Sequence, residues 1–162
     1  MTMLETIAVA FSMFSAIPMP QFLWNEKNMR YVLCAFPLIG AVIGAVCWGA
    51  WSLCGLLELP GLLRGAILTL IPVLVTGGIH LDGYSDTCDA LASHASQEKK
   101  LEILKDSRAG AFAVLSCGCY LLLSCGLYAE ILEKQMGAMQ NFSDSRKLFV
   151  LALGFTVSRA LS

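Results

Sequence analysis

Long runs of hydrophobic residues dominate this chain. About 20 apolar residues in a helix cross the roughly 30 Å hydrocarbon core of a bilayer, and four segments approach that length. These predicted spans are residues 31–57, 62–79, 109–132 and 147–162. In the first span, Gly40 and Gly44 are spaced so that a second helix can approach closely. The pattern therefore predicts an all-α, polytopic integral membrane helical bundle, with residues 1–162 forming a single membrane domain.

Both ends of the chain depart from this pattern of spans. Residues 1–17 are mainly apolar but contain Glu5, and they lack the basic region and small-residue cleavage site of a signal peptide. We expect a short uncleaved helix there, interfacial or re-entrant, and the sequence does not decide whether it crosses the bilayer. The span that begins at residue 147 stops without a capping signal, so we expect the sequence to be incomplete at its C-terminus.

Composition supports a membrane protein and excludes other classes. Hydrophobic residues make up 57% of the chain and charged residues 14%, with a mean hydropathy of +0.69, whereas about a quarter of a soluble domain is charged. A net charge of −1 offers no basic face to nucleic acid. Six of the seven cysteines lie in apolar runs and none has C-x-x-C spacing, which indicates unpaired thiols.

The charged residues gather in one segment, which also sets the predicted orientation. Ten of them lie between residues 82 and 108. If the first two spans cross, the side that holds the 18–30 and 80–108 loops has six Lys and Arg, against four on the other side. The positive-inside rule then places the 80–108 loop, which we take as the active loop, on the cytoplasmic face of the plasma membrane.

Three aspartates in this loop share one face of a predicted helix. At about 100° per residue, Asp86 and Asp89 lie roughly 40° and 20° to either side of Asp82. Their negative charges repel one another, and a divalent cation turns that repulsion into binding. Oxygen ligands favour Mg²⁺. Capping of a helix N-terminus also explains Asp82 well and Asp86 in part, but it explains Asp89 poorly. We therefore predict that Asp82, Asp86 and Asp89 bind metal.

The residues before this cluster have two interpretations each. His80 is either a catalytic residue or an interfacial histidine that caps the preceding span. Gly77 and Gly78 either allow a phosphate to approach the backbone or simply end a helix.

A second polar motif precedes the third span. Residues 96–105 predict a short amphipathic helix, and either Asp106 or Ser107 would make an ordinary N-cap for the span that follows. Arg108 in the first turn of a helix opposes the helix dipole, so it needs a partner, either the aspartate cluster or a bound phosphate. Carboxylates for a metal ion, with Lys105 and Arg108 for phosphate, suit phosphoryl or nucleotidyl transfer.

These motifs resemble the cobalamin synthase (adenosylcobinamide-GDP ribazoletransferase) family. Residues 77–83, followed by Asp86 and Asp89, resemble its most distinctive motif, and residues 101–110 resemble its second. Three further stretches match in the same order, namely residues 14–20, 36–40 and 157–161. There are also departures, since Ala16 stands where the family often has a basic residue and Ala90 where many members have Gly. Family members are longer than this chain.

The resemblance implies a reaction in cobalamin biosynthesis. A ribose hydroxyl of α-ribazole, or of its 5′-phosphate, attacks the cobinamide-bound phosphate of adenosylcobinamide-GDP, GMP leaves, and adenosylcobalamin or its 5′-phosphate forms. Mg²⁺ on the three aspartates would bridge the diphosphate, and Asp106 would be a further ligand or a base. The implied catalytic residues are His80, Asp106 and Arg108, and the implied phosphate-binding residues are Gly77, Gly78, Lys105 and Arg108.

Two other functions stay open at this point. A CDP-alcohol phosphotransferase would use a similar aspartate cluster and Mg²⁺, but its usual motif orders the residues differently. A divalent-cation transporter would place carboxylates inside its spans, whereas every Asp here lies outside the apolar runs. A homo-oligomer is compatible with the sequence, which does not fix the number of subunits or the choice between riboside and 5′-phosphate.

Overall fold

The structure, a computed structural model, describes residues 3–20, 31–106, 108–136, 150 and 153–158. The described part of the chain is helical and contains no strand, which confirms the all-α prediction. In chain order the elements are α1 (Met3–Phe14), the 3₁₀ helix η1 (Leu33–Ala35), α3 (Phe36–Leu56), α4 (Gly61–Thr76), α5 (Ile79–Ala92), α6 (Gln97–Ile103) and α7 (Ala111–Met136).

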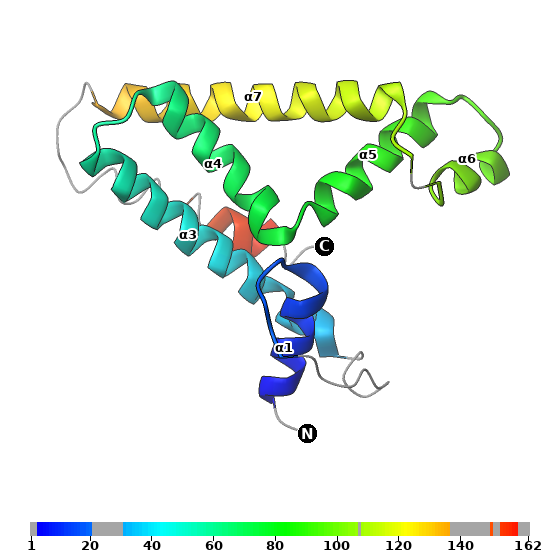
Figure 1. Cartoon of the computed structure of the whole chain (residues 1–162), viewed down its shortest axis with the longest axis horizontal. Coiled ribbons are helices and arrows are strands. Elements are labelled where there is room, and N and C mark those ends of the chain that lie inside the picture. Colours follow the sequence, from blue (N-terminus) through cyan, green and yellow to red (C-terminus); the bar gives the residue numbers. More distant parts are fainter. Residues whose placement is uncertain (1–2, 21–30, 107, 137–149, 151–152, 159–162) are drawn as a thin grey trace.

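Helices α4, α5 and α7 form a triangle in the ribbon view (Figure 1). The chain bends by 94° between α4 and α5, and α7 lies along the open side of this V and packs against both helices. The bend falls on Gly77 and Gly78, whose φ angles of +65° and +81° are left-handed, a conformation that glycine adopts without steric cost. The glycine pair therefore ends α4 at Thr76 and turns the chain into α5.

The helices match the lengths that a bilayer requires. Among the residues that the structure describes, two segments are long and apolar enough to cross, Leu33–Leu56 and Ala111–Glu130, and the bent α4–α5 pair adds a third if it counts as one broken span. The predicted second span, residues 62–79, is shorter than expected because α4 ends at Thr76. Most of the predicted span at 147–162 lies outside the described residues, and its described part is helical. The polytopic membrane bundle is thus confirmed.

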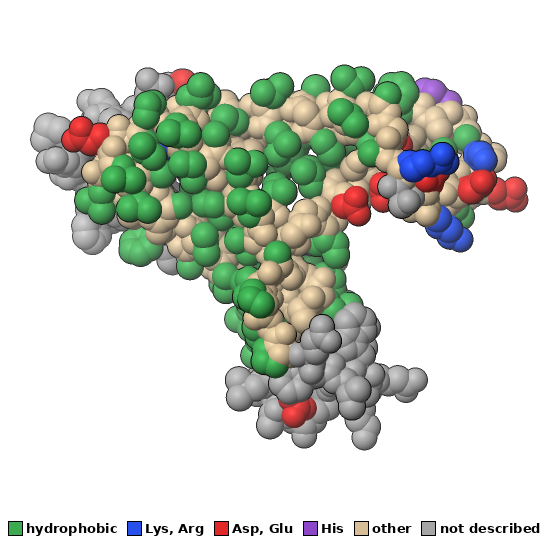
Figure 2. Space-filling view, in the orientation of Figure 1, with side chains coloured by type: hydrophobic (Ala, Val, Ile, Leu, Met, Phe, Trp, Pro, Cys, Tyr) green, Lys and Arg blue, Asp and Glu red, His purple; other side chains and the backbone are tan. Residues whose placement is uncertain are grey.

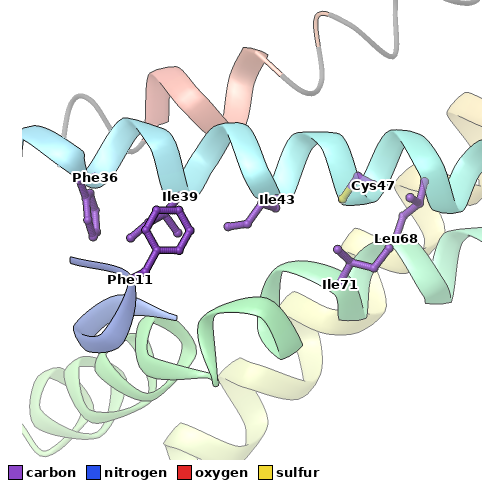
Figure 3. Close-up of a cluster of buried hydrophobic side chains, with 7 residues drawn as sticks. All are labelled: Phe11, Phe36, Ile39, Ile43, Cys47, Leu68 and Ile71. Carbon is purple, nitrogen blue, oxygen red and sulfur yellow. The ribbon is translucent and has the colours of Figure 1, made fainter. Parts of the chain in front are cut away.

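The apolar core lies where α1, α3 and α4 meet (Figure 3). Its buried side chains are Phe11, Phe36, Ile39, Ile43, Cys47, Leu68 and Ile71. The expected N-terminal helix is present as α1, and its inner face packs into this core. Just after α1, the Ala16 N–H donates to the Val75 carbonyl over 2.9 Å. This bond fixes the segment after α1 beside the end of α4.

Two glycines allow backbones to touch. A Cβ on Gly40 would lie 2.5 Å from the carbonyl oxygen of Phe155, so the C-terminal segment rests directly on α3. This contact confirms the close approach predicted at Gly40. A Cβ on Gly65 of α4 would likewise lie 2.5 Å from the Cys125 carbonyl oxygen and 2.8 Å from the Ala129 nitrogen of α7. Small residues thus allow these segments to pack closely, as is typical of membrane proteins.

Candidate active site

All three predicted metal-binding aspartates lie on α5, the helix that follows the glycine turn. The space-filling view (Figure 2) shows acidic and basic side chains gathered over α6 and the adjoining end of α5, while most of the remaining described face is hydrophobic. Helices α5 and α6 together cover most of residues 80–108. Helix α6 confirms the short helix expected over residues 96–105.

A hollow of about 520 Å³ opens beside the glycine turn. Its lining comes from the turn, from the first half of α5 and from α7, and consists of Gly77, Gly78, Ile79, Leu81, Asp82, Ser85 and Cys117. A Cβ on Gly78 would meet nothing within 4 Å, so the turn leaves room for a ligand. The fold thus brings the predicted phosphate-binding glycines and the first aspartate to the same hollow.

The backbone of the glycine turn is already engaged. The Gly77 N–H donates to the Leu74 carbonyl over 3.2 Å, and the Gly78 N–H donates to the Val73 carbonyl over 2.8 Å. These bonds close the last turn of α4 and satisfy two of its free carbonyls. What the glycines offer a phosphate is therefore space rather than hydrogen-bond donors.

Asp82 and Asp86 suit a metal ion that also binds substrate. Asp82 is exposed and Asp86 is half-buried one turn further along α5, and neither joins an ion pair within the described part of the chain. No group of three His, Cys, Asp or Glu residues in this part is arranged to hold a metal by itself. Mg²⁺ commonly uses one or two carboxylates together with water and substrate phosphates, so this carboxylate pair fits it.

Asp89 has a different environment from the other two aspartates. Its Oδ2 accepts the Gly110 N–H over 2.5 Å, and its Oδ1 accepts the Ala113 N–H over 2.8 Å. Both donors belong to the start of α7, where free N–H groups need acceptors. Sequence reasoning missed this contact, because the partners are 21 and 24 residues away. The prediction that Asp89 binds metal stays a prediction.

Arg108 pairs with Asp106 rather than with the aspartates of α5. Its guanidinium contacts the Asp106 carboxylate at 2.7 Å, and its backbone N–H donates to the same carboxylate over 3.1 Å. These hydrogen bonds lower the pKa of Asp106 from 3.8 to about 2, because they favour the ionised form. The Arg108 side chain is still 87% exposed. Lys105 is also exposed, and neither basic residue lines the hollow.

His80 borders a second cavity, of about 330 Å³. This cavity lies between α4, α5, α7 and the C-terminal segment, and Tyr84 and Tyr120 line it together with His80. The rings of His80 and Phe36 also meet in a T-shaped arrangement, with centroids 5.8 Å apart. Leu81 borders both cavities. The structure therefore places His80 next to the hollow that Asp82 lines, but not in it.

Fold and site together define a polytopic, all-helical membrane protein whose acidic helix follows a glycine turn beside an open hollow. The chain belongs to the cobalamin-5-phosphate synthase family, whose sequence model matches residues 6–162. This match confirms the resemblance drawn from the motifs.

Several curated relatives carry the printed name adenosylcobinamide-GDP ribazoletransferase. The protein of that name from Lachnoclostridium phytofermentans is 45% identical over 162 residues, which are 100% of this chain and 58% of the relative. The Clostridium botulinum (strain Eklund 17B) relative is 40% identical over 110 residues, which are 68% of this chain and 44% of the relative. The chain thus spans about half the length of these relatives. No solved structure shows a significant match to this chain.

Proposed function

We propose that this protein is a membrane transferase that joins adenosylcobinamide-GDP to α-ribazole or its 5′-phosphate and releases GMP. The observation that carries the proposal is the hollow where the Gly77–Gly78 turn and Asp82 meet. It offers room for a diphosphate next to a carboxylate. Membership of the family and the printed name of its relatives support the choice of substrates.

In this proposal Asp82 and Asp86 hold Mg²⁺. The bound ion would neutralise charge on the diphosphate and on the leaving GMP. The chain itself contributes the open glycine turn, which admits the phosphates. It also contributes the exposed Arg108 and Lys105, which lie outside the hollow and would attract a negatively charged substrate to this face of the protein.

The reaction exchanges one phosphate bond for another. The ribose hydroxyl oxygen forms a bond to the phosphorus attached to cobinamide, and the bond from that phosphorus to the bridging oxygen breaks. GMP leaves with the electron pair, and the hydroxyl proton passes to a base. Asp106 is a weak base because Arg108 lowers its pKa to about 2. His80, beside the hollow, is the better candidate for this proton.

The proposal also includes an orientation in the plasma membrane. Lys99, Lys100, Lys105 and Arg108 lie in the charged region formed by α6 and the segment before α7. Basic residues favour the cytoplasmic side, so we place this charged region there. A cysteine introduced at Lys99 should react with an impermeant maleimide in inside-out vesicles and not in right-side-out vesicles. The opposite labelling would contradict this orientation.

Turnover in membranes tests the reaction. With adenosylcobinamide-GDP and α-ribazole, we expect GMP and a cobalamin product only when Mg²⁺ is present. Asp82→Asn and Asp86→Asn should each lower turnover by about 100-fold or more, since each removes a charged ligand. Glu98→Gln on α6 is the matched control and should retain full activity.

The full-length Lachnoclostridium relative serves as the reference in the same assay. The proposal is wrong if this chain releases no GMP under conditions in which that relative does. Product formed from CDP-diacylglycerol would instead support an alcohol phosphotransferase. Metal flux into liposomes without any product would support a transporter.

A further inference from the structure

The start of α7 is capped by a residue of another helix. In a capping box, the N-cap side chain accepts the N3 N–H and the N3 side chain accepts the N-cap N–H. Here Gly110 occupies the N-cap position and Ala113 the N3 position of α7, and neither has a side chain that could do this. Asp89 of α5 accepts both N–H groups instead, one with each carboxylate oxygen.

Gly110 makes room for this carboxylate. A Cβ at position 110 would lie 2.7 Å from both Asp89 oxygens, too close for any side chain without a shift. By contrast, a Cβ on Gly118, two turns along α7, would meet nothing within 4 Å. Gly110 and Asp89 therefore form one matched contact, in which the missing side chain on α7 admits the carboxylate from α5.

The electrostatics of this contact oppose metal binding at Asp89. The N-terminus of α7 carries about half a positive charge, which a carboxylate neutralises. Two N–H groups already point at its oxygens. A cation placed at the same oxygens would meet the positive end of the helix and those two hydrogens, whereas Asp82 and Asp86 accept no such bonds in the described part of the chain.

We propose that Asp89 is a positioning residue rather than a metal ligand. It fixes the start of α7 onto α5, and with it the preceding segment that carries Asp106 and Arg108. Arg108 thereby keeps a constant place relative to Asp82 and Asp86, which lie on the same helix as Asp89. The inference rests on the proposed function for its catalytic part, while the contact itself can be tested without turnover.

The contact is tested first by hydrogen exchange in detergent micelles. Asp89→Asn replaces one accepting oxygen by an NH₂ group that faces an N–H donor, so one bond is lost. We expect exchange at Gly110 and Ala113 to rise at least about tenfold while the core of α3 stays protected. Gly110→Ala should have the same effect by displacing the carboxylate, and Gly118→Ala should not. Unchanged exchange in both variants would overturn the proposal.

Measurements of metal affinity show whether Asp89 is a positioning residue or a metal ligand. Mn²⁺ binding, followed by electron paramagnetic resonance, should weaken at least tenfold in Asp82→Asn. It should stay within about twofold of wild type in Asp89→Asn and Gly110→Ala. A loss in Asp89→Asn as large as that in Asp82→Asn would make Asp89 a ligand and overturn the proposal. If Asp89→Asn does not accumulate in membranes, Gly110→Ala supports the same comparison, since it retains every carboxylate.

Steady-state kinetics test the consequence for Arg108. Displacing the segment before α7 should raise the KM for adenosylcobinamide-GDP about 10- to 100-fold in both variants. The KM for α-ribazole, which has no phosphate, should be unchanged. An equal rise in both KM values would indicate general damage and contradict the positioning role. If exchange changes as expected but no form of the protein releases GMP, the contact stands and the proposed function fails.

Discussion

The apolar and the polar regions of this molecule are held together in different ways. In the apolar region, α1, α3 and α4 meet through buried side chains such as Ile39 and Ile43, which are fully enclosed. In the polar region, α5 and the start of α7 meet through the two hydrogen bonds of Asp89, and the adjoining segment is held by the Asp106–Arg108 pair.

This difference determines what each region is sensitive to. Packing depends on volume, so the apolar region should respond to lost or added atoms. Hydrogen bonds depend on direction and on the type of atom, so the polar region should respond to isosteric changes that leave volume constant. A side chain that faces lipid can change its volume without effect, unlike one in the packed core. A site that positions a substrate cannot accept an isosteric change that removes a hydrogen bond.

The largest effect on stability is expected in the apolar core. Leu68 of α4 is 1% exposed, whereas Leu74 on the same helix is 68% exposed. Leu68→Ala should lower the free energy of unfolding by about 2–5 kcal/mol, because it leaves a cavity in the buried cluster of α1, α3 and α4. Leu74→Ala, the matched control, should change it by less than about 0.5 kcal/mol. Unfolding in mixed micelles measures both, and equal losses would show that α4 is not packed as described.

Added volume should have the next largest effect. Gly65→Ala puts a methyl group against the backbone of α7, where the Cys125 carbonyl oxygen and Ala129 nitrogen cannot yield without a shift of the helix. We expect a cost of about 1–3 kcal/mol. Gly126→Ala on α7 faces open space and should be neutral or stabilising by up to about 1 kcal/mol, because alanine favours helix. The same unfolding assay tests the pair, and a neutral Gly65→Ala would contradict the close contact.

A smaller effect, dependent on pH, is expected in the polar region. The pKa of Asp106 is lowered from 3.8 to about 2 by the hydrogen bonds from Arg108. The folded protein therefore binds fewer protons at this carboxyl than the unfolded chain does, so stability rises with pH across this interval. The contribution is complete above about pH 5 and disappears as pH falls through about 2.

Asp106→Asn should remove this dependence. The difference in melting temperature between wild type and variant should be constant from pH 7 to about pH 5 and should shrink toward pH 2. The whole difference should be a few degrees at most, because the pair is exposed to solvent. Arg108→Gln should give a profile of the same shape but smaller size, since it removes the guanidinium and leaves the backbone N–H of residue 108 bonded to the carboxylate. A difference that grows on acidification would contradict the ion pair.

The apolar region could be predicted from the sequence, since it depends on composition. The run at residues 31–57 predicts a span because the length of hydrocarbon to be crossed fixes the number of apolar residues, and α3 with η1 fills that range. The pair Gly40 and Gly44 predicts a close helix contact, and Gly40 makes one. Such features are local or periodic, so one stretch of sequence contains the whole signal.

The polar region could be predicted only in part. The shared face of the aspartates follows from helix geometry, but the partners of Asp89 come from a helix that begins more than 20 residues later. No pattern within one segment contains such a pairing. A weak signal was nevertheless present, since α7 starts with Gly110 and Ala113 at positions that usually carry capping side chains. A helix start without a cap of its own requires an acceptor from elsewhere.

The smallest effect is expected at an ion pair that resembles Asp106–Arg108 in distance alone. Lys99 and Glu102 of α6 are 2.7 Å apart, with side chains that are 58% and 70% exposed. Lys99→Ala should change the free energy of unfolding by less than about 0.5 kcal/mol, and the change should vanish in 1 M salt, because solvent and ions screen exposed charges. The Asp106–Arg108 contact has the same 2.7 Å distance, but it adds a backbone hydrogen bond over 3.1 Å. A larger loss in Lys99→Ala than in Asp106→Ala, which removes the acceptor of this bond, would show that the backbone bond contributes nothing and that both pairs are ordinary surface contacts.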